Sequence, residues 1–200
     1  MARRTEQKEQ TRQRILASAR VVFEAQGFEA ASLREIARQA GVAIGTIFVH
    51  FHDKLDLLHA AFFEDLAEAL SVILSQPTRD SLDEWLSHLT DGMLSYYESR
   101  PVLARVLLKQ SLLADPPWAE RFAAQIAEVH GAVIARAEIA RSQGEIRDDA
   151  NLPLFAAAYI AFYMFALIAW AQKAHPAPRD LVKHLTAQHL RALGTGITNP

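Results

Sequence analysis

The sequence predicts an all-α protein, and three observations point to that class. Apolar residues recur three and four positions apart along most of the 200-residue chain, which is the spacing of a helix with one buried face. Glycines and prolines interrupt this pattern at intervals that divide the chain into about nine helices. The sequence has no run of alternating Val, Ile and Thr of the kind that forms strands. The length allows one domain, or a small domain joined to a larger one.

The expected helices are separated by helix-breaking residues. The first runs from about residue 5 to Gln26 and ends at Gly27, a residue type that commonly closes helices. The next three are expected at about 33–40, 44–50 and 54–75. The remaining five are expected at about 80–99, 101–114, 118–143, 151–173 and 178–193. A proline lies near the start of each of these last five helices.

Composition and charge narrow the functional classes. Half of the residues are apolar and 22% are charged, as in globular proteins. The chain has no cysteine, which excludes disulfides, cysteine–zinc sites, iron–sulfur clusters and thiol catalysis. The formal net charge of −2, taken alone, argues against nucleic acid, because phosphates are bound by basic side chains. The charge is uneven, however: residues 1–52 carry +3 and the remaining 148 carry −5. Because residues 1–52 carry a positive net charge, DNA remains a candidate partner for this segment.

The N-terminus and one apolar stretch bear on location. The first residues lack the apolar segment of a secretory signal, so a cytoplasmic protein is expected. Residues 152–171 carry no formal charge and are long enough to cross a bilayer. Pro153, Tyr159, Tyr163 and many alanines in this stretch favour a buried helix or a helix shared between subunits. No membrane partner is expected.

The second and third expected helices have the features of a helix-turn-helix. Ser32 and Glu35 form the pattern of a capping box at a helix start. Gly41 supplies the positive φ that a tight turn requires. Val42 and Ile47 are expected to bury against the first helix. In this motif the second helix enters the major groove of DNA.

The chain resembles the TetR family of bacterial transcriptional regulators over about residues 9–68. The residues that carry the resemblance are Thr11, Ile15, Leu16, Ala19, Phe23, Gly27, Phe28, Ser32, Ile36, Ala37, Gly41, Val42, Gly45, Thr46, Ile47, Phe48, His50, Phe51, Lys54, Leu57 and Leu58. The resemblance implies an N-terminal three-helix DNA-binding domain at 9–68, preceded by a basic arm at 1–8. It also implies a larger C-terminal helical domain at 69–200 that binds a ligand and dimerises.

The resemblance further implies which side chains meet DNA. Gly45 would allow close backbone approach, and the Thr46 hydroxyl would bond a phosphate or a base edge. His50 would donate to a phosphate, and Lys54 would form an anion site with the amides of the next helix start. The expected DNA-binding residues are Arg4, Thr11, Arg12, Ser32, Ala43, Ile44, Gly45, Thr46, Phe48, Val49, His50 and Lys54. The alternatives are a plain helix-start glycine at Gly45 and a solvated His50.

Four positions set the chemistry of the recognition helix. Family members usually have Tyr where this chain has Phe48, which cannot donate a hydrogen bond to a phosphate. Ala43 and Ile44 replace the more usual Ser and polar or basic residues, and with Val49 they leave this face apolar. Sequence readout would then depend on thymine methyls and groove shape more than on bidentate hydrogen bonds.

Basic residues also precede and begin the first helix. Arg3, Arg4 and Lys8 would follow the DNA backbone or enter the minor groove as an arm. The alternative is a solvated tail. Thr11 and Arg12 would reach a phosphate from the start of the helix.

Residues 70–200 lack catalytic motifs. They contain no HExxH, Gly-x-Ser-x-Gly, P-loop or dinucleotide fingerprint. His184 and His189 lie five positions apart, so on a helix they point about 140° away from each other and make a poor metal pair. We expect no enzyme, no metal and no cofactor. A cofactorless helical enzyme and a membrane-associated helical protein are the competing hypotheses.

The C-terminal region combines apolar helices with aromatic side chains and a few hydroxyls, as small-molecule sites do. The candidate ligand-binding residues are Met93, Tyr96, Tyr97, Phe122, Ile126, Phe155, Tyr159, Phe162 and Tyr163. For each of them core packing is the alternative. By the resemblance, the helices at 151–173 and 178–193 would form a four-helix bundle with a second copy. The predicted function is a homodimeric repressor, released from a palindromic DNA operator by a small, mostly apolar inducer.

Overall fold

The computed structural model describes residues 2–75, 81–111 and 115–194, and within them it has nine α-helices. In chain order they are α1 (Ala2–Ala30), α2 (Leu33–Ala40), α3 (Ile44–His50), α4 (Lys54–Ser75), α5 (Leu82–Glu98), α6 (Pro101–Ser111), α7 (Trp118–Ser142), α8 (Leu152–Ala171) and α9 (Pro178–Leu193). One isolated β-bridge joins Ile146 to Gly194. The predicted all-α class is confirmed.

Each predicted helix has a counterpart whose ends differ by a few residues. Some predicted positions lie outside the described residues. These are residue 1 of the predicted arm, residues 80 and 112–114 of the predicted helices, and residues 195–200 of the predicted C-terminal domain.

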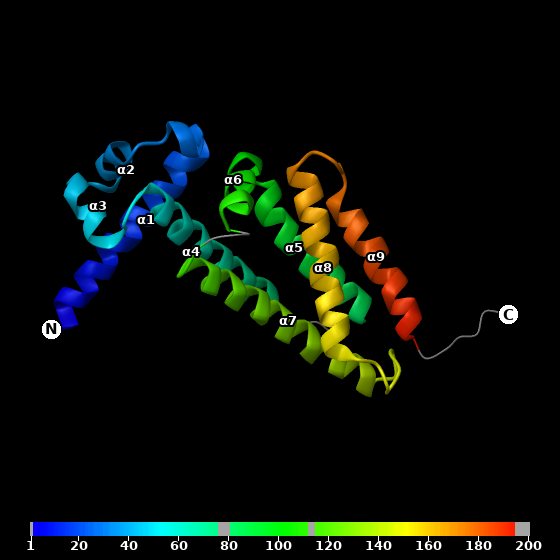
Figure 1. Ribbon diagram of the computed structural model, residues 1–200. Coiled ribbons are helices and arrows are strands. Elements are labelled where there is room, and N and C mark those ends of the chain that lie inside the picture. The colour runs from blue at the N-terminus through cyan, green and yellow to red at the C-terminus, as the bar shows by residue number, and fades with distance from the viewer. Residues whose placement is uncertain (1, 76–80, 112–114, 195–200) are drawn as a thin grey trace.

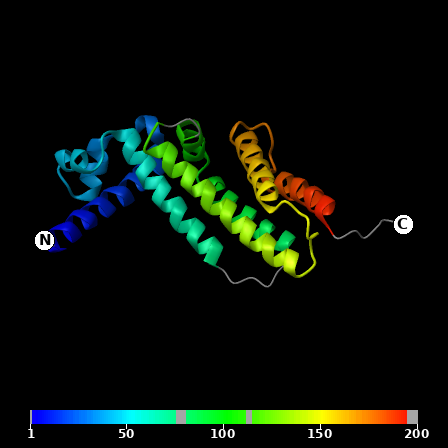
Figure 2. The same ribbon diagram turned by 60° about the horizontal axis from the view of Figure 1, so that its bottom comes forward.

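Helix α4 connects the two parts of the molecule (Figure 1). Helices α1, α2 and α3 lie at the N-terminal end, α5 to α9 lie at the other, and α4 runs from the first group into the second. Helices α4 and α7 lie side by side in both views (Figure 2). Helix α8 contacts both α7 and α9. The N-terminal part therefore meets the C-terminal helices mainly through α4.

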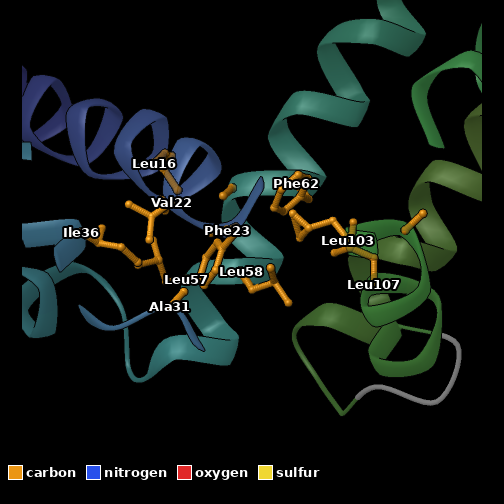
Figure 3. Packing of buried hydrophobic residues seen from close by; sticks show 14 of the residues in the cluster. Leu16, Val22, Phe23, Ala31, Ile36, Leu57, Leu58, Phe62, Leu103 and Leu107 are labelled. Atoms are coloured by element: carbon orange, nitrogen blue, oxygen red, sulfur yellow. The ribbon is translucent and has the colours of Figure 1, made fainter. Parts of the chain in front are cut away.

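Apolar side chains of α1 and α4 form the core of the N-terminal part (Figure 3). Leu16 and Phe23 of α1 lie against Leu57 and Leu58 of α4, and all four are buried. Burying a side chain of this size contributes about 1.5–3 kcal/mol. Phe62, one turn further along α4, faces α6, so the same cluster continues into the C-terminal part.

A second buried cluster holds the C-terminal helices together. It includes Leu86 of α5, Val133 of α7, Phe155 of α8 and Val182 of α9. Helix α4 also contributes Leu70 to this cluster. Helix α4 therefore belongs to both cores.

Helix α8 is, among the helices that the structure describes, the one long and apolar enough to cross a membrane by length and composition. Its inner face is buried and includes Phe155, Tyr159, Tyr163 and Leu167. These residues pack into clusters shared with α4, α5, α7 and α9. This face is part of the core of the domain.

Helix α1 differs from the predicted first helix at both ends. Gly27 breaks the helical geometry with φ 76° and ψ 167°, as predicted, but the chain resumes a helical turn that ends at Ala30. Helix α1 begins at Ala2, so residues 2–8 belong to this helix. The prediction that these residues form an arm separate from the first helix is therefore wrong. The reason is local, because no glycine or proline occurs before Gly27 and Arg, Gln, Glu and Lys are good helix formers.

Lys54, at the start of α4, holds the end of α1. Its Nζ donates to the backbone oxygens of Phe28 at 2.7 Å, Ala31 at 3.1 Å and Glu29 at 3.2 Å. It also lies 4.5 Å from the centroid of the Phe28 ring. Carbonyl groups at the C-terminal end of a helix have no partner within that helix, and a cation there also favours the helix dipole. One side chain thus sets how α1 meets α4.

Replacing Lys54 by Ala should destabilise the fold, because three backbone carbonyls lose their donor. We expect the free energy of unfolding to fall by about 1–3 kcal/mol, and each kcal/mol to lower Tm by about 2–4 °C for a chain of this size. Urea and thermal unfolding measure both quantities. Lys109→Ala, at an exposed position on α6, is the control. Equal stability of the two variants would contradict the role given to Lys54.

Candidate DNA-binding face and ligand cavity

A tight turn at Gly41 joins α2 to α3. Gly41 has φ 67° and ψ 38°, a left-handed conformation that side chains with a Cβ oppose. The backbone N–H of Val42 donates to the Ala37 carbonyl at 3.0 Å and closes the turn. Ile47 of α3 is buried in the core shared with α1 and α4, while Val42 is half-buried beside it. The two short helices therefore have the helix-turn-helix arrangement that their spacing predicts.

The predicted capping box at the start of α2 is half formed. The Ser32 hydroxyl oxygen accepts from the Glu35 backbone N–H at 3.2 Å. The Glu35 carboxylate, however, accepts two hydrogen bonds from Arg38, at 2.6 and 3.0 Å. A bidentate charge-assisted pair is stronger than the return bond to the Ser32 amide. Ser32 thus caps α2, and Glu35 pairs with Arg38, which lies in the next turn of the same helix.

Helix α3 lies at the N-terminal end of the molecule (Figure 1), and one of its faces is exposed and apolar. The exposed residues of this helix and its N-cap are Ala43, Ile44, Gly45, Phe48 and Val49. Phe48 is 56% exposed and Val49 is 68% exposed, although both are large apolar side chains. Large apolar side chains are usually buried, and a group of them on the surface commonly marks a site where another molecule binds. This face is a candidate contact surface.

Thr46 and His50 flank this apolar face and are both half-buried. Burial lowers the pKa of His50, and the nearby positive charges of Lys8 and Arg12 lower it further. The His50 imidazole is therefore neutral at neutral pH. It offers a phosphate one ring N–H and no positive charge.

The predicted contacts of α1 fall into two groups. Arg4 is exposed in the first turns of α1. The Thr11 hydroxyl donates to the Gln7 carbonyl at 2.9 Å. Arg12 pairs with Glu64 of α4 at 2.5 Å. The guanidinium of Arg12 joins α1 to α4, and the phosphate contact predicted for Arg12 stays a prediction.

Lys54 is likewise engaged within the protein, and the phosphate contact predicted for it stays a prediction. All three ammonium donors of a lysine are accounted for by the three carbonyls at the end of α1. The start of α4 is occupied as well, since Asp53 Oδ1 accepts from the Asp56 backbone N–H at 2.8 Å. That hydrogen bond lowers the pKa of Asp53 and keeps a negative charge where an external anion would sit.

A cavity of two lobes lies among α4, α5, α6, α7 and α8. Both lobes are lined by Leu66, Tyr97, Phe122 and Gln125. The α6 lobe has a volume of about 30 Å³ and is also lined by Phe62, Phe63, Tyr96, Leu107 and Leu108. The α8 lobe has a volume of about 50 Å³ and is also lined by Leu70, Met93, Ile126, Val129, Tyr159, Ile160, Tyr163 and Met164. Ligand sites commonly measure about 300–1,000 Å³, so a ligand that enters either lobe has to displace side chains of the wall.

Seven of the nine predicted ligand-binding residues lie in the cavity wall. They are Met93, Tyr96, Tyr97, Phe122, Ile126, Tyr159 and Tyr163. Phe155 and Phe162 instead contact the ring of His189 on α9, at centroid distances of 5.6 and 5.9 Å. Phe162 points about 100° away from Tyr163 around α8, and Phe155 lies one turn before Tyr159, where α9 covers the helix. Both side chains pack between α8 and α9 in this structure, and their predicted contact with a ligand stays a prediction.

The sequence prediction missed ten lining residues. They are Phe62, Phe63, Leu66, Leu70, Leu107, Leu108, Gln125, Val129, Ile160 and Met164. Helical spacing was the available signal, because Phe62, Leu66 and Leu70 lie four apart on one face of α4. Gln125 shares a face of α7 with Phe122 for the same reason.

Two of the four hydroxyls in the cavity wall have hydrogen-bond partners within the described part of the protein. The hydroxyl of Tyr159 lies 3.0 Å from that of Thr90. Tyr96 donates to the Phe62 carbonyl at 3.2 Å. Burial raises the pKa of Tyr97 to about 12, so this phenol is neutral across the physiological range.

Arg100 connects the cavity wall to the N-terminal part. Its guanidinium lies 4.9 Å from the centroid of the Tyr96 ring. Its Nε donates to Glu24 of α1 at 2.6 Å, and a terminal nitrogen lies 3.5 Å from Asp65 of α4. Asp65 in turn pairs with Arg20 of α1 at 3.2 Å. Arg100 therefore links Tyr96, in the cavity wall, to both α1 and α4 through side-chain contacts.

His59 of α4 is buried where α4 meets α7. It is 3% exposed, and its ring lies 5.2 Å from Trp118 and 6.1 Å from Phe63. Neither ring nitrogen has a hydrogen-bond partner within the described part of the chain. Burial lowers the pKa of His59, while the negative charges of Asp56 and Asp53 oppose that effect.

Comparisons with known sequences agree with this arrangement. The family model described as bacterial regulatory proteins, tetR family, matches residues 15–61. The transcriptional repressor AcnR of Corynebacterium diphtheriae is 31% identical over 139 residues, which cover 69% of each chain. The regulator SrpR of Pseudomonas putida is 51% identical over 61 residues, which cover 30% of this chain and 29% of SrpR. These relatives are transcriptional regulators, so the enzyme hypothesis is set aside.

Solved structures share the fold along nearly the whole chain. A TetR transcription regulator of Haloarcula marismortui matches with a TM-score of 0.77 and 16% identity, over 92% of this chain and 98% of that one. The fatty acid degradation regulator FadR of Bacillus halodurans matches with a TM-score of 0.69 and 20% identity, over 90% and 98%. FadR of Bacillus subtilis, solved in complex with stearoyl-CoA, matches with a TM-score of 0.67 and 21% identity, over 92% and 98%.

The buried His59 should make stability depend on pH. Because its pKa is lowered in the folded state, the unfolded chain takes up the proton more readily. The stabilising contribution is complete above the ordinary pKa of about 6.5 and is lost as the pH falls through that value toward the lowered one. Urea unfolding at a series of pH values should show this loss in the wild type and a flatter profile in His59→Leu. The exposed His184→Gln variant is the control, and parallel profiles for wild type and His59→Leu would refute the prediction.

Proposed function

The chain belongs to the TetR family of transcriptional regulators, and from this premise we propose that it is a homodimeric repressor which a small, mostly apolar ligand releases from a palindromic DNA operator. The single observation that supports DNA recognition most directly is the exposed apolar face of α3 beyond a buried Ile47. The name of AcnR as a repressor supports the direction of regulation. Such a regulator acts in the cytoplasm, on the chromosome.

In the proposed complex α3 lies in the major groove. Its exposed Ile44, Phe48 and Val49 offer methyl and ring surfaces without hydrogen-bonding groups. Such side chains suit the C5-methyl group of thymine. Thr46, His50 and Arg4 supply the polar contacts to backbone phosphates, and Gly45 allows the helix start to approach closely.

Helices α8 and α9 are the proposed dimer interface. Leu154, Ala157, Ala161 and Phe165 follow one another at helical spacing along the outer face of α8, and Leu154 and Phe165 are 64% and 62% exposed. Alanines in the middle of such a stripe allow two helices to approach closely. A second copy would cover this face by two-fold symmetry, which also matches a palindromic operator.

The cavity between α4 and α8 is the proposed ligand site. The stearoyl-CoA complex of FadR from Bacillus subtilis supports an apolar ligand for a chain of this fold. Helix α4 lines both lobes and also carries Glu64 and Asp65, which pair with Arg12 and Arg20 of α1. A ligand that prefers one position of α4 would shift the spacing of the two α3 helices, and release follows from that preference.

A mobility-shift assay with the DNA upstream of the protein's own gene tests the proposal. We expect a specific shift that competitor DNA does not remove, and its loss on adding an apolar ligand identified by thermal shift. Phe165→Asp, which places a charge in the proposed dimer face, should give a folded monomer that binds the same DNA at least tenfold more weakly, because one half-site contact is lost. Absence of a specific shift at low salt with folded, dimeric protein would refute the proposal.

The apolar α3 face predicts how operator bases are read. Replacing each thymine of a half-site by uracil removes a methyl group and leaves base pairing unchanged. We expect at least one such replacement to weaken binding by roughly the transfer free energy of a methyl group, about 0.8 kcal/mol or fourfold. Val49→Ser should abolish the effect at the thymine that Val49 contacts. A half-site indifferent to every replacement would contradict methyl readout.

A further inference from the structure

The α8 lobe of the cavity is uncharged. None of its described lining residues is Asp, Glu, Lys, Arg or His. Its wall consists of aliphatic and aromatic side chains together with three tyrosines and Gln125. An ion placed there would lose its hydration without gaining a partner of opposite charge. A group that enters this lobe must therefore be neutral.

Two polar groups of this lobe are left without partners. Tyr163 is only 4% exposed, and its hydroxyl has no hydrogen-bond partner within the described residues. Gln125 donates from Nε2 to the Phe63 carbonyl at 3.1 Å, which assigns its other atom, Oε1, as an acceptor. That buried oxygen is also without a partner in the described part of the chain. Unpaired buried polar groups destabilise a folded protein and call for an explanation.

The neighbouring hydroxyl shows that the wall can satisfy its own polar groups. Tyr159 lies one turn before Tyr163 on α8 and lines the same lobe, yet its hydroxyl is 3.0 Å from the Thr90 hydroxyl. Thr90 donates in turn to the Leu86 carbonyl at 2.8 Å. The Tyr163 hydroxyl and Gln125 Oε1 thus differ from the Tyr159 hydroxyl in being unsatisfied.

We infer that the α8 lobe binds a neutral, largely apolar ligand that carries a hydroxyl group, and that Tyr163 and Gln125 determine this specificity. A hydroxyl is both a donor and an acceptor. It can donate to Gln125 Oε1 and accept from the Tyr163 O–H, whereas a carboxylate offers Oε1 only a repelling oxygen. The inference rests on the proposed function only in that a ligand enters this cavity.

Three probes of similar shape separate these chemistries. They are 2-naphthol, naphthalene and 2-naphthoate, and their affinity for the DNA-free protein is measured by calorimetry at neutral pH. We expect 2-naphthol to bind about three- to tenfold more tightly than naphthalene, which is the range of one net hydrogen bond. We expect 2-naphthoate to bind more weakly than either, because its charge is not compensated.

Variants assign this preference to the two residues. Tyr163→Phe and Gln125→Leu should each lower the ratio of naphthol to naphthalene affinity toward one, because each removes one of the two hydrogen bonds to the hydroxyl. Tyr163→Phe should also raise the Tm of the ligand-free protein by about 2–4 °C, since it removes an unpaired buried hydroxyl. Thr186→Val on α9 is the matched control: Thr186 is buried, its hydroxyl has no partner within the described residues, and it does not line this lobe. It should leave the affinity ratio at the wild-type value.

The outcomes separate this inference from the proposed function. Four outcomes would overturn the inference. The wild type could bind 2-naphthol and naphthalene equally well, bind 2-naphthoate tightly, or bind none of the three probes. In Tyr163→Phe, the ratio of naphthol to naphthalene affinity could be unchanged. Specific DNA binding that some other apolar ligand reverses would in that case still support the proposed function. Conversely, selective 2-naphthol binding without any DNA shift would refute the proposed function and leave the inference standing.

Discussion

Helix α4 has to pack in two cores at once, and the rest of the structure depends on that constraint. Leu57 and Leu58 near its start bury against α1, while Leu70 near its end buries among α5, α7 and α8. Lys54 ties its first turn to the end of α1. No glycine or proline interrupts α4, so it contains none of the residues that usually kink a helix. In the proposed mechanism, a shift imposed at the cavity wall reaches the helix-turn-helix through this one helix.

Three of the eight basic residues in the first 52 positions pair with carboxylates of the protein. Arg12 and Arg20 pair with Glu64 and Asp65 of α4, and Arg38 pairs with Glu35. The +3 of the first 52 residues includes Arg12 and Arg20, whose charges the carboxylates of α4 balance. In the proposed complex, DNA affinity depends on close apolar contacts of α3 and on two copies binding together, more than on charge.

Local patterns predicted the elements of the fold well. The bounds of α2, α3 and α4 follow from Ser32, Gly41 and Asp53, because caps and breakers act within one turn of the chain. The arm was predicted incorrectly because helix propensity continues without a breaker to Ala2. Seven cavity residues were predicted from their apolar or aromatic character, whereas Phe155 and Phe162 pack against His189 of α9. Which neighbour covers a helix face depends on packing.

The sequence by itself determined the helix-turn-helix, the apolar face of α3 and the uncharged α8, since each depends on residues within about one helix of one another. Tertiary structure alone decided the partners of long polar side chains. Lys54 reaches carbonyls more than twenty positions earlier, and Arg12 reaches a carboxylate fifty-two positions later. It also decided that Tyr159 is satisfied while Tyr163, on the same face of α8, is not. Hydrogen bonds require positions accurate to a fraction of an ångström, and such accuracy arises only when all the helices have packed.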